Sequence, residues 1–257
     1  MNYFLGFFIF FFGASIGSFL NVLIDRLPQD KKITGRSYCD HCRHQLALYD
    51  LIPILSFFLL KGRCRYCGKK ISFQYPLVEL ITGILFIFIF KDSPFSRTVL
   101  LWGIASCFIV IFFSDVKYHL ISDYIFWALF GFSLMLKLFK NFSLIEVLNQ
   151  VQDDIFSGLI VAFPIWLIYF LSKEKAMGLG DVYLSAILGF LLGWQKGFLA
   201  LYLAFVLGGI VGFLLIIFGR KKLKSKIAFG PFLIIGGLVM LFWGDEILKW
   251  VIRIYRL

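Results

Sequence analysis

The sequence predicts an all-α polytopic membrane protein, with about eight transmembrane helices and a cytoplasmic four-cysteine loop that looks like a zinc ribbon. Three observations predict this fold class. Hydrophobic residues make up 60% of the chain and charged residues 16%, whereas a soluble domain carries roughly 25% charge. The mean hydropathy is +0.88, and phenylalanine alone occurs 33 times. Several apolar runs approach or exceed the ~18 residues that a helix needs to cross a bilayer. This pattern excludes an ordinary soluble domain.

The apolar runs give the positions of the predicted helices, which are residues 4–24, 76–90, 98–114, 123–138, 155–171, 179–194, 197–218 and 228–243. The first run lacks a preceding basic residue and a following cleavage site, so it is predicted to be a retained helix rather than a signal peptide. The chain then divides into a first transmembrane helix (1–24), a loop domain (25–75), a membrane-embedded domain (76–243) and a C-terminal tail (244–257).

The net charge of +11 is explained by topology. Most Lys and Arg residues fall in alternate connections, namely 25–75, 115–122, 172–178 and 219–227. The basic tract at 220–226 is the clearest of them. Because positive residues collect on the cytoplasmic side of a membrane protein, these loops are predicted to be cytoplasmic and the N-terminus to lie outside. The lipid bilayer is an expected partner of the chain, and nucleic acid is not.

Four cysteines stand in the loop domain as two CxxC pairs, Cys39 with Cys42 and Cys64 with Cys67. Two such pairs joined by a loop of this size can place four thiolates around one Zn²⁺, with no position open for a substrate. The predicted reducing compartment argues against disulfides, although redox use remains the alternative. His41 and His44 are expected to be solvated, and Cys107, inside a predicted helix, to be a small buried residue.

Acidic residues at the membrane edge are functional candidates, because ionisable groups are costly in a bilayer. Asp115 closes one predicted helix, whereas Asp123 and Asp181 each begin one, and all three fall on the predicted cytoplasmic side. Two aspartates that share a proton are the minimum needed to activate water against a peptide bond. The alternative is that Asp123 and Asp181 only cap the helices that follow them.

The remaining acids carry weaker expectations. Four of them are predicted to be plain loop or interface residues on the outer side, namely Asp153, Asp154, Asp245 and Glu246. Asp50 is expected to pair with Lys or Arg of the basic loop, and Glu79 is ambiguous.

Taken together and in order, several segments resemble the type IV prepilin peptidases, a GxGD class of membrane aspartyl proteases. They are GASIGSFLNVLIDRLP at 13–28, the two CxxC pairs, YDLIPILSFFLLKGRCRYC at 49–67, YPLVEL at 75–80, SDVKYHLISD at 114–123 and GLGDVYLSAILG at 178–189. The resemblance covers the first to the sixth predicted helix, while the last two rest on hydropathy alone.

The resemblance implies a multi-pass protein of a bacterial cytoplasmic membrane, with Asp115 and Asp181 as the catalytic pair. It implies cleavage of a basic leader from prepilin and pseudopilin precursors at the cytoplasmic face, as in pilus assembly, competence or protein secretion. Many members also methylate the new N-terminal residue with S-adenosylmethionine, and the part of the loop associated with this activity corresponds to Gly62 and Arg63. Asp50 and Glu79 are possible partners for the basic leader.

The sequence departs from the family pattern at three positions. Ser122 replaces a frequent proline, Tyr183 a frequent lysine, and Arg63 a lysine. None removes a predicted catalytic carboxylate, whereas Arg63 bears on methylation because arginine and lysine are not equivalent. The alternatives are a peptidase without methyltransferase activity, a non-enzymatic assembly factor that docks partners through its zinc loop, and a transporter.

A helix-dipole argument also predicts different roles for Asp115 and Asp181. Asp181 begins a helix and Asp115 closes one, so Asp181 is expected to be the more acidic partner and Asp115 the proton carrier.

Overall fold

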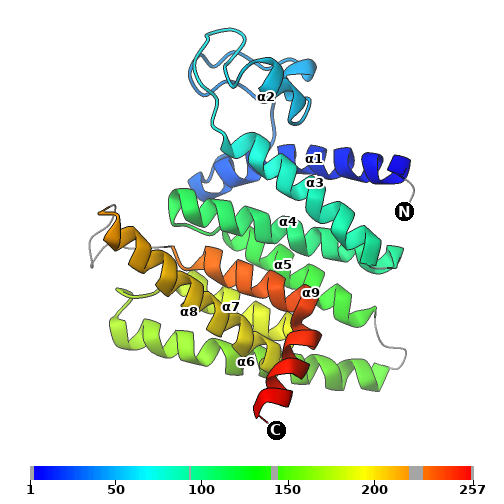
Figure 1. Cartoon of the computed structure of the whole chain (residues 1–257), viewed down its shortest axis with the longest axis vertical. Helices are drawn as coiled ribbons and strands as arrows, with labels where there is room; N and C mark the ends of the chain where they lie inside the picture. Colours follow the sequence, from blue (N-terminus) through cyan, green and yellow to red (C-terminus); the bar gives the residue numbers. More distant parts are fainter. Residues whose placement is uncertain (1–2, 93, 140–143, 220–227, 256–257) are drawn as a thin grey trace. The chain divides into compact units, whose positions relative to one another are not determined.

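The structure is a computed structural model that describes residues 3–92, 94–139, 144–219 and 228–255. Within these residues every regular element is helical, and the only strand-like pairing is two isolated bridges in the cysteine loop. This confirms the predicted all-α class (Figure 1). The long helices are α1 (Tyr3–Arg26), α3 (Gln74–Asp92), α4 (Phe95–Tyr118), α5 (Asp123–Leu138), α6 (Leu144–Ser172), α7 (Leu179–Leu192), α8 (Trp194–Ile217) and α9 (Gly230–Tyr255).

Six of these helices, α1, α3, α4, α6, α8 and α9, are long and apolar enough to cross a membrane. The other two predicted spans, α5 and α7, have 16 and 14 residues. At 1.5 Å per residue, α7 is about 21 Å long, whereas the hydrocarbon core of a bilayer is about 30 Å thick. The described residues therefore contain about as many apolar helices as predicted, but α5 and α7 are shorter than the other six.

Two helix ends differ from the prediction. Helix α6 begins at Leu144 instead of residue 155, and α9 continues to Tyr255, so most of the predicted C-terminal tail is helical. In both extensions polar side chains alternate with apolar ones, which lowers hydropathy without breaking a helix. The predicted basic marker at 220–226 lies outside the described residues.

The chain forms two compact units, Met1–Val110 and Ile111–Leu257, with the boundary inside α4. This division differs from the predicted one, because the first helix, the cysteine loop and α3 belong to a single unit. In this unit α1 and α3 lie side by side (Figure 1). A Cβ atom on Gly17 would lie 2.7 Å from the Cα atom of Glu79, so only glycine permits this close packing.

The second unit is built around α7, which contacts α5, α6, α8 and α9. Its contact with α6 is the closest, because a Cβ atom on Gly189 would lie 2.9 Å from the Cα atom of Gly158. Most residues of α7 are buried, from Val182 to Leu191. The N-terminal turn of this central helix carries Asp181, so the packing of the whole unit fixes the position of that carboxyl group.

Candidate active site and metal centre

Asp115 lies near the C-terminal end of α4 and is only 7% exposed. Its neighbour Ser114 is also buried. The carboxyl group of Asp115 accepts a hydrogen bond from the backbone N–H of Gly230, the first residue of α9, and interacts with the charge of His119. The side chain is thus held between two helices that are distant in sequence.

Asp181 lies in the first turn of α7, three residues after Gly178, the residue that caps the helix. Its Oδ2 atom accepts a hydrogen bond from the backbone N–H of Gly178 at 3.3 Å. Gly180 has Ile121 and Phe126 beside it, because a Cβ atom there would lie 3.5 Å and 3.8 Å from those side chains. The N-cap of α7 is thus Gly178 and not Asp181, although Asp181 does close the first turn of the helix by accepting the Gly178 N–H.

The charges of the two predicted catalytic carboxyl groups interact. The third candidate, Asp123, is the first residue of α5 and has an exposed side chain, as expected of a residue at a helix end. Two carboxyl groups whose charges interact, one buried and the other half-buried, favour a state in which one is protonated and the other ionised. That is the arrangement that acid–base activation of water requires.

The helix-dipole argument that separated the two aspartates loses its premise, and which of them is the more acidic stays a prediction. It assumed that Asp181 alone faces the positive end of a helix. The N-terminus of α9 reaches Asp115, so both carboxyl groups accept a backbone N–H at a helix start. Helix dipoles therefore do not distinguish the base from the acid.

The four predicted metal ligands come together in the loop domain. The Sγ atoms of Cys39, Cys42, Cys64 and Cys67 all lie within 4.8 Å of one another, and those of Cys39 and Cys67 are 3.9 Å apart. Tetrahedral Zn–S bonds of about 2.3 Å put sulfur atoms about 3.8 Å apart, so the cluster fits a zinc ion. Cys107 is buried in α4, as predicted. These four cysteines can bind a metal ion.

Each CxxC pair is folded as a small turn of the same design. The backbone N–H of Cys39 bonds the carbonyl oxygen of His44 at 3.0 Å, and that of Cys64 bonds the carbonyl of Lys69 at 2.8 Å. The residue after the second cysteine is left-handed in both turns, with φ of 58° at Arg43 and 70° at Gly68. The local sequence thus builds each half of the metal site by itself.

The thiols differ in acidity before a metal binds. Burial opposes ionisation of Cys39, but hydrogen bonds from the backbone of Cys42 and His41 and from neighbouring thiols lower its pKa to about 7. A backbone hydrogen bond from Lys69 favours the thiolate of Cys67, yet burial and three neighbouring thiols raise its pKa to about 11. A cation among the four sulfur atoms removes this conflict, because it stabilises all four as thiolates.

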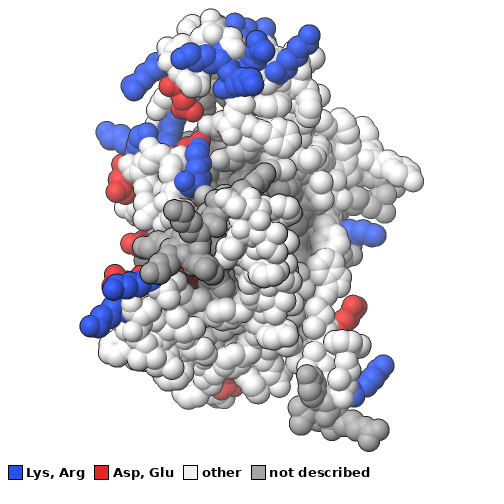
Figure 2. Space-filling view, turned by 60° about the vertical axis from the view of Figure 1, so that its left-hand side comes forward, with Lys and Arg blue, Asp and Glu red and all other residues white. Residues whose placement is uncertain are grey.

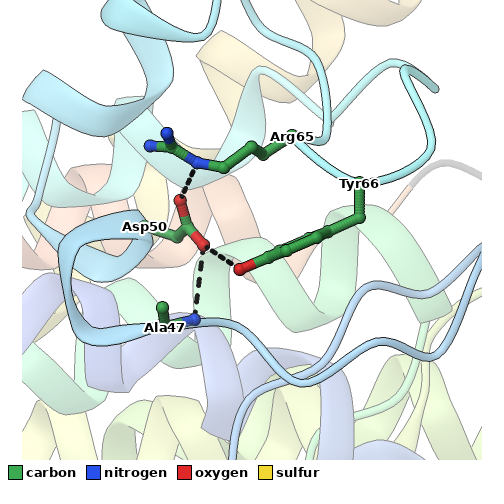
Figure 3. A network of polar contacts seen from close by, with 4 residues as sticks. All are labelled: Ala47, Asp50, Arg65 and Tyr66. Atoms are coloured by element: carbon green, nitrogen blue, oxygen red, sulfur yellow. Dashed lines mark hydrogen bonds and ion pairs between the residues drawn. The ribbon is translucent and has the colours of Figure 1, made fainter.

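Asp50 joins the second cysteine turn to the rest of the loop (Figure 3). Its Oδ1 atom accepts a hydrogen bond from Nε of Arg65 at 2.8 Å, and its Oδ2 atom accepts bonds from the Tyr66 hydroxyl at 3.1 Å and the Ala47 N–H at 3.3 Å. The Asp50 side chain is only 3% exposed. The expected pairing with a basic residue is confirmed, and the suggested contact with a substrate leader is not supported, because both oxygens are occupied.

Comparisons with known proteins agree with this geometry. Residues 11–92 match the bacterial peptidase A24 N-terminal domain, and residues 100–213 match the type IV leader peptidase family. The prepilin leader peptidase/N-methyltransferase of Aeromonas hydrophila is 32% identical, over 94% of this chain and 92% of that protein. Those of Stutzerimonas stutzeri and Legionella pneumophila are 31% and 30% identical, over 95% and 94% of this chain and 93% and 92% of theirs.

The chain belongs to the type IV leader peptidase family. This confirms the family resemblance and the prediction of an integral membrane peptidase. No solved structure matches the chain. The match to the leader peptidase family includes Asp115 and Asp181 and ends before α9.

A hollow of about 320 Å³ lies in the cysteine loop of this leader peptidase, beside the two residues predicted to contact a methyl donor. Gly62 and Arg63 line it together with Phe57, Lys61 and Lys70. Gly62 is left-handed, with φ of 67°, and a Cβ atom there would lie 3.1 Å from the Phe57 ring. Basic side chains also gather over the loop surface (Figure 2). The hollow thus combines positive charge with an aromatic wall.

Two buried acids have roles that the sequence did not reveal. Glu79 accepts the backbone N–H of Ile54 at 2.7 Å and so ties the loop to α3. Asp154, predicted to be a plain edge residue, is 8% exposed and pairs with Nζ of Lys137 at 2.9 Å. The prediction for Asp154 is therefore wrong, because α6 extends past it and packs it against α5. Neither pairing has a sequence signal, since both depend on contacts between separate elements.

Proposed function

We propose that the chain is a membrane aspartyl endopeptidase that removes the leader peptide from type IV prepilin-like precursors, with Asp115 and Asp181 as its catalytic pair. The observation that carries the proposal is the charge coupling of these two carboxyl groups, each held by a backbone N–H at the start of a helix. The predicted position of both residues at the cytoplasmic face puts the cleavage there, in a bacterial cytoplasmic membrane.

In the proposed reaction the ionised carboxylate takes a proton from a water molecule, and the water oxygen bonds to the scissile carbonyl carbon. The protonated carboxyl group donates its proton to the carbonyl oxygen. When the tetrahedral intermediate collapses, the C–N bond breaks and the leaving amine receives the proton that the base took from water. The other carboxylate takes back a proton from one hydroxyl group of the intermediate as the carbonyl reforms, so the pair returns to its starting protonation.

The substrates are single apolar helices with a basic leader, as in pilins and the pseudopilins of competence and secretion systems. The exposed apolar surfaces of the bundle face the lipid bilayer, and the substrate helix enters through that phase. The departures at Ser122 and Tyr183 remove neither carboxyl group. Tyr183 is 48% exposed, and its ring lies 6.0 Å from that of Phe126.

The protein also methylates the new N-terminal residue in this proposal, with the hollow beside Gly62 and Arg63 as the methyl-donor site. S-adenosylmethionine supplies an activated methyl group and carries a carboxylate. The cations of Lys61, Arg63 and Lys70 are placed to bind that carboxylate, and the Phe57 ring offers a stacking surface. Structural zinc held by Cys39, Cys42, Cys64 and Cys67 fixes the fold of this loop, because four sulfur ligands leave no open position for chemistry.

The experiment incubates purified protein with a prepilin and reads the product masses, beside Asp115→Asn and Asp181→Asn. The wild type is expected to remove the leader, and each variant to lose cleavage, whereas Asp123→Asn keeps most of it because that side chain is exposed. Cleavage by both Asp115→Asn and Asp181→Asn would overturn the peptidase assignment. A further mass gain of one methyl group, only with S-adenosylmethionine present and lost in Gly62→Ala, supports the second activity; its absence from the wild type leaves a peptidase alone.

A further inference from the structure

We propose that the start of α9 is part of the peptidase site, and that Gly230 is a positioning residue that holds the catalytic carboxyl group of Asp115. The proposal rests on the function assigned above to Asp115. It goes beyond the family match, which ends at residue 213, and beyond the sequence motifs, which end at residue 189.

The space around Gly230 is filled by the side chain of Asp115. A Cβ atom on Gly230 would lie 2.5 Å from Oδ2, 3.3 Å from Cγ and 3.6 Å from Cβ of Asp115. Because real Cβ atoms essentially never approach another atom this closely, any side chain at position 230 displaces the carboxyl group. Glycine is needed here for its lack of a side chain, since its position allows a close approach to the catalytic group.

The same residue provides the hydrogen-bond donor. The first backbone N–H groups of a helix have no acceptor within the helix. Pro231 has no N–H group, so Gly230 carries the only donor among the first two residues of α9, and this donor bonds to Asp115. The backbone N–H groups of Phe232 and Leu233 already bond the carbonyl oxygen of Phe229, at 3.0 Å and 3.2 Å.

The rest of α9 is held tightly enough to fix this donor. A Cβ atom on Gly236 would overlap the carbonyl oxygen of Ala200 in α8, and one on Gly237 would lie 2.6 Å from the Leu188 side chain in α7. Helix α9 therefore packs closely against α7, which carries Asp181, and against α8. Its packing sets the position of Gly230 relative to α7, and so aligns the carboxyl group of Asp115 with that of Asp181.

The carboxyl groups of both catalytic residues thus accept a backbone N–H, but the two donors come from different parts of the chain. Asp181 receives its N–H from Gly178, three residues earlier, whereas Asp115 receives its N–H from a helix far along the sequence. A Cβ atom on Gly178 would lie 3.9 Å from Oδ2 of Asp181, an ordinary contact. A methyl group is therefore tolerated beside Asp181 and is not tolerated beside Asp115.

The test compares Gly230→Ala with Gly209→Ala, a helical position with nothing within 4 Å. Displacing a catalytic group by about 1 Å costs on the order of 10²-fold in rate. Gly230→Ala is expected to lower kcat by about this factor, to leave KM within about threefold, and to move the pH profile of kcat, whereas Gly209→Ala keeps wild-type kinetics. A change in KM alone, or an unchanged pH profile, would overturn the positioning role.

A second measurement does not depend on activity. The distance of 3.6 Å between a Cβ atom at position 230 and Cβ of Asp115 lies within the range of about 3.5–4.5 Å for disulfides. The double variant Asp115→Cys and Gly230→Cys, with Cys107→Ala to remove the other thiol of α4, is expected to cross-link under mild oxidation. The pair Asp115→Cys and Gly209→Cys is the matched control. Absence of the cross-link would overturn the proposal even if Gly230→Ala fails to fold. Full activity of Gly230→Ala beside an inactive Asp115→Asn would overturn the role of Gly230 and leave the peptidase assignment unchanged.

Discussion

The cysteine loop and the aspartate pair are two sites built on opposite principles. Each half of the metal cluster is a turn of a few residues whose backbone bonds return to the same segment, as from Cys39 to His44. The aspartate pair has no such local frame. It needs α4, α7 and α9, which meet only when the second unit is packed. The comparison teaches that the cysteine loop is stabilised by short local turns, whereas the aspartate pair is stabilised by helix packing.

Among the changes proposed here, removing the metal should have the largest effect on stability, and the segment that loses its structure should be the cysteine loop. Structural zinc contributes about 10–16 kcal/mol to the folding of small zinc modules, so the loop is expected to unfold without it. We expect one zinc ion per chain by metal analysis and none in Cys64→Ser. Rapid tryptic cleavage between residues 26 and 70 would follow, with prepilin cleavage reduced far less than in Asp115→Asn. A loss of cleavage as complete as in Asp115→Asn would show that the two sites are not independent.

The reciprocal change is Asp181→Asn, which should leave the loop untouched. Loss of a catalytic acid or base typically lowers a rate by about 10²–10⁴-fold, and that fall is expected in kcat for leader removal. Zinc content and tryptic resistance should match those of the wild type. Methyl transfer to a peptide that already has the mature N-terminus should continue. If that transfer also stops, the methyl-donor hollow and the aspartate pair act as one site.

The sequence predicted the two sites to different degrees for a physical reason. CxxC spacing, loop length and ligand chemistry are local, so all four cysteines were found from the sequence. Asp115 and Asp181 were chosen by membrane depth and family order, but the N–H from Gly230 was missed because it depends on how α9 packs. The predicted helix ends were wrong where a helix continues through polar residues, as α6 does at Asp154. The hydropathy pattern located the helices, and it contains no information on which helix ends meet.

A smaller effect is expected from the ion pair of Lys137 and Asp154, which joins α5 to α6 in the unit that carries the aspartates. Both side chains are at most 15% exposed. Breaking a buried pair leaves one charge without its partner and costs about 3–5 kcal/mol. Lys137→Met should therefore lower the melting temperature in detergent, and adding Asp154→Leu should restore much of it. Additive losses in the double variant would show that the two residues are not energetically coupled.

The smallest effect is expected at Asp50, which provides the loop with a contact that is independent of the metal. Asp50→Asn keeps the shape but weakens the bond to Arg65 and the acceptor for Tyr66, and the cost of such a change at a buried carboxylate is about 1–3 kcal/mol. Arg65 is 47% exposed, so solvent screening places the effect toward the lower end. Hydrogen exchange should speed up in residues 47–66 with zinc still bound. Asp30→Asn, an exposed left-handed position where Asn is equally suited, is the matched control. Zinc loss in Asp50→Asn would mean that the network holds the second cysteine turn in place, and the loop would then depend on packing as the aspartate pair does.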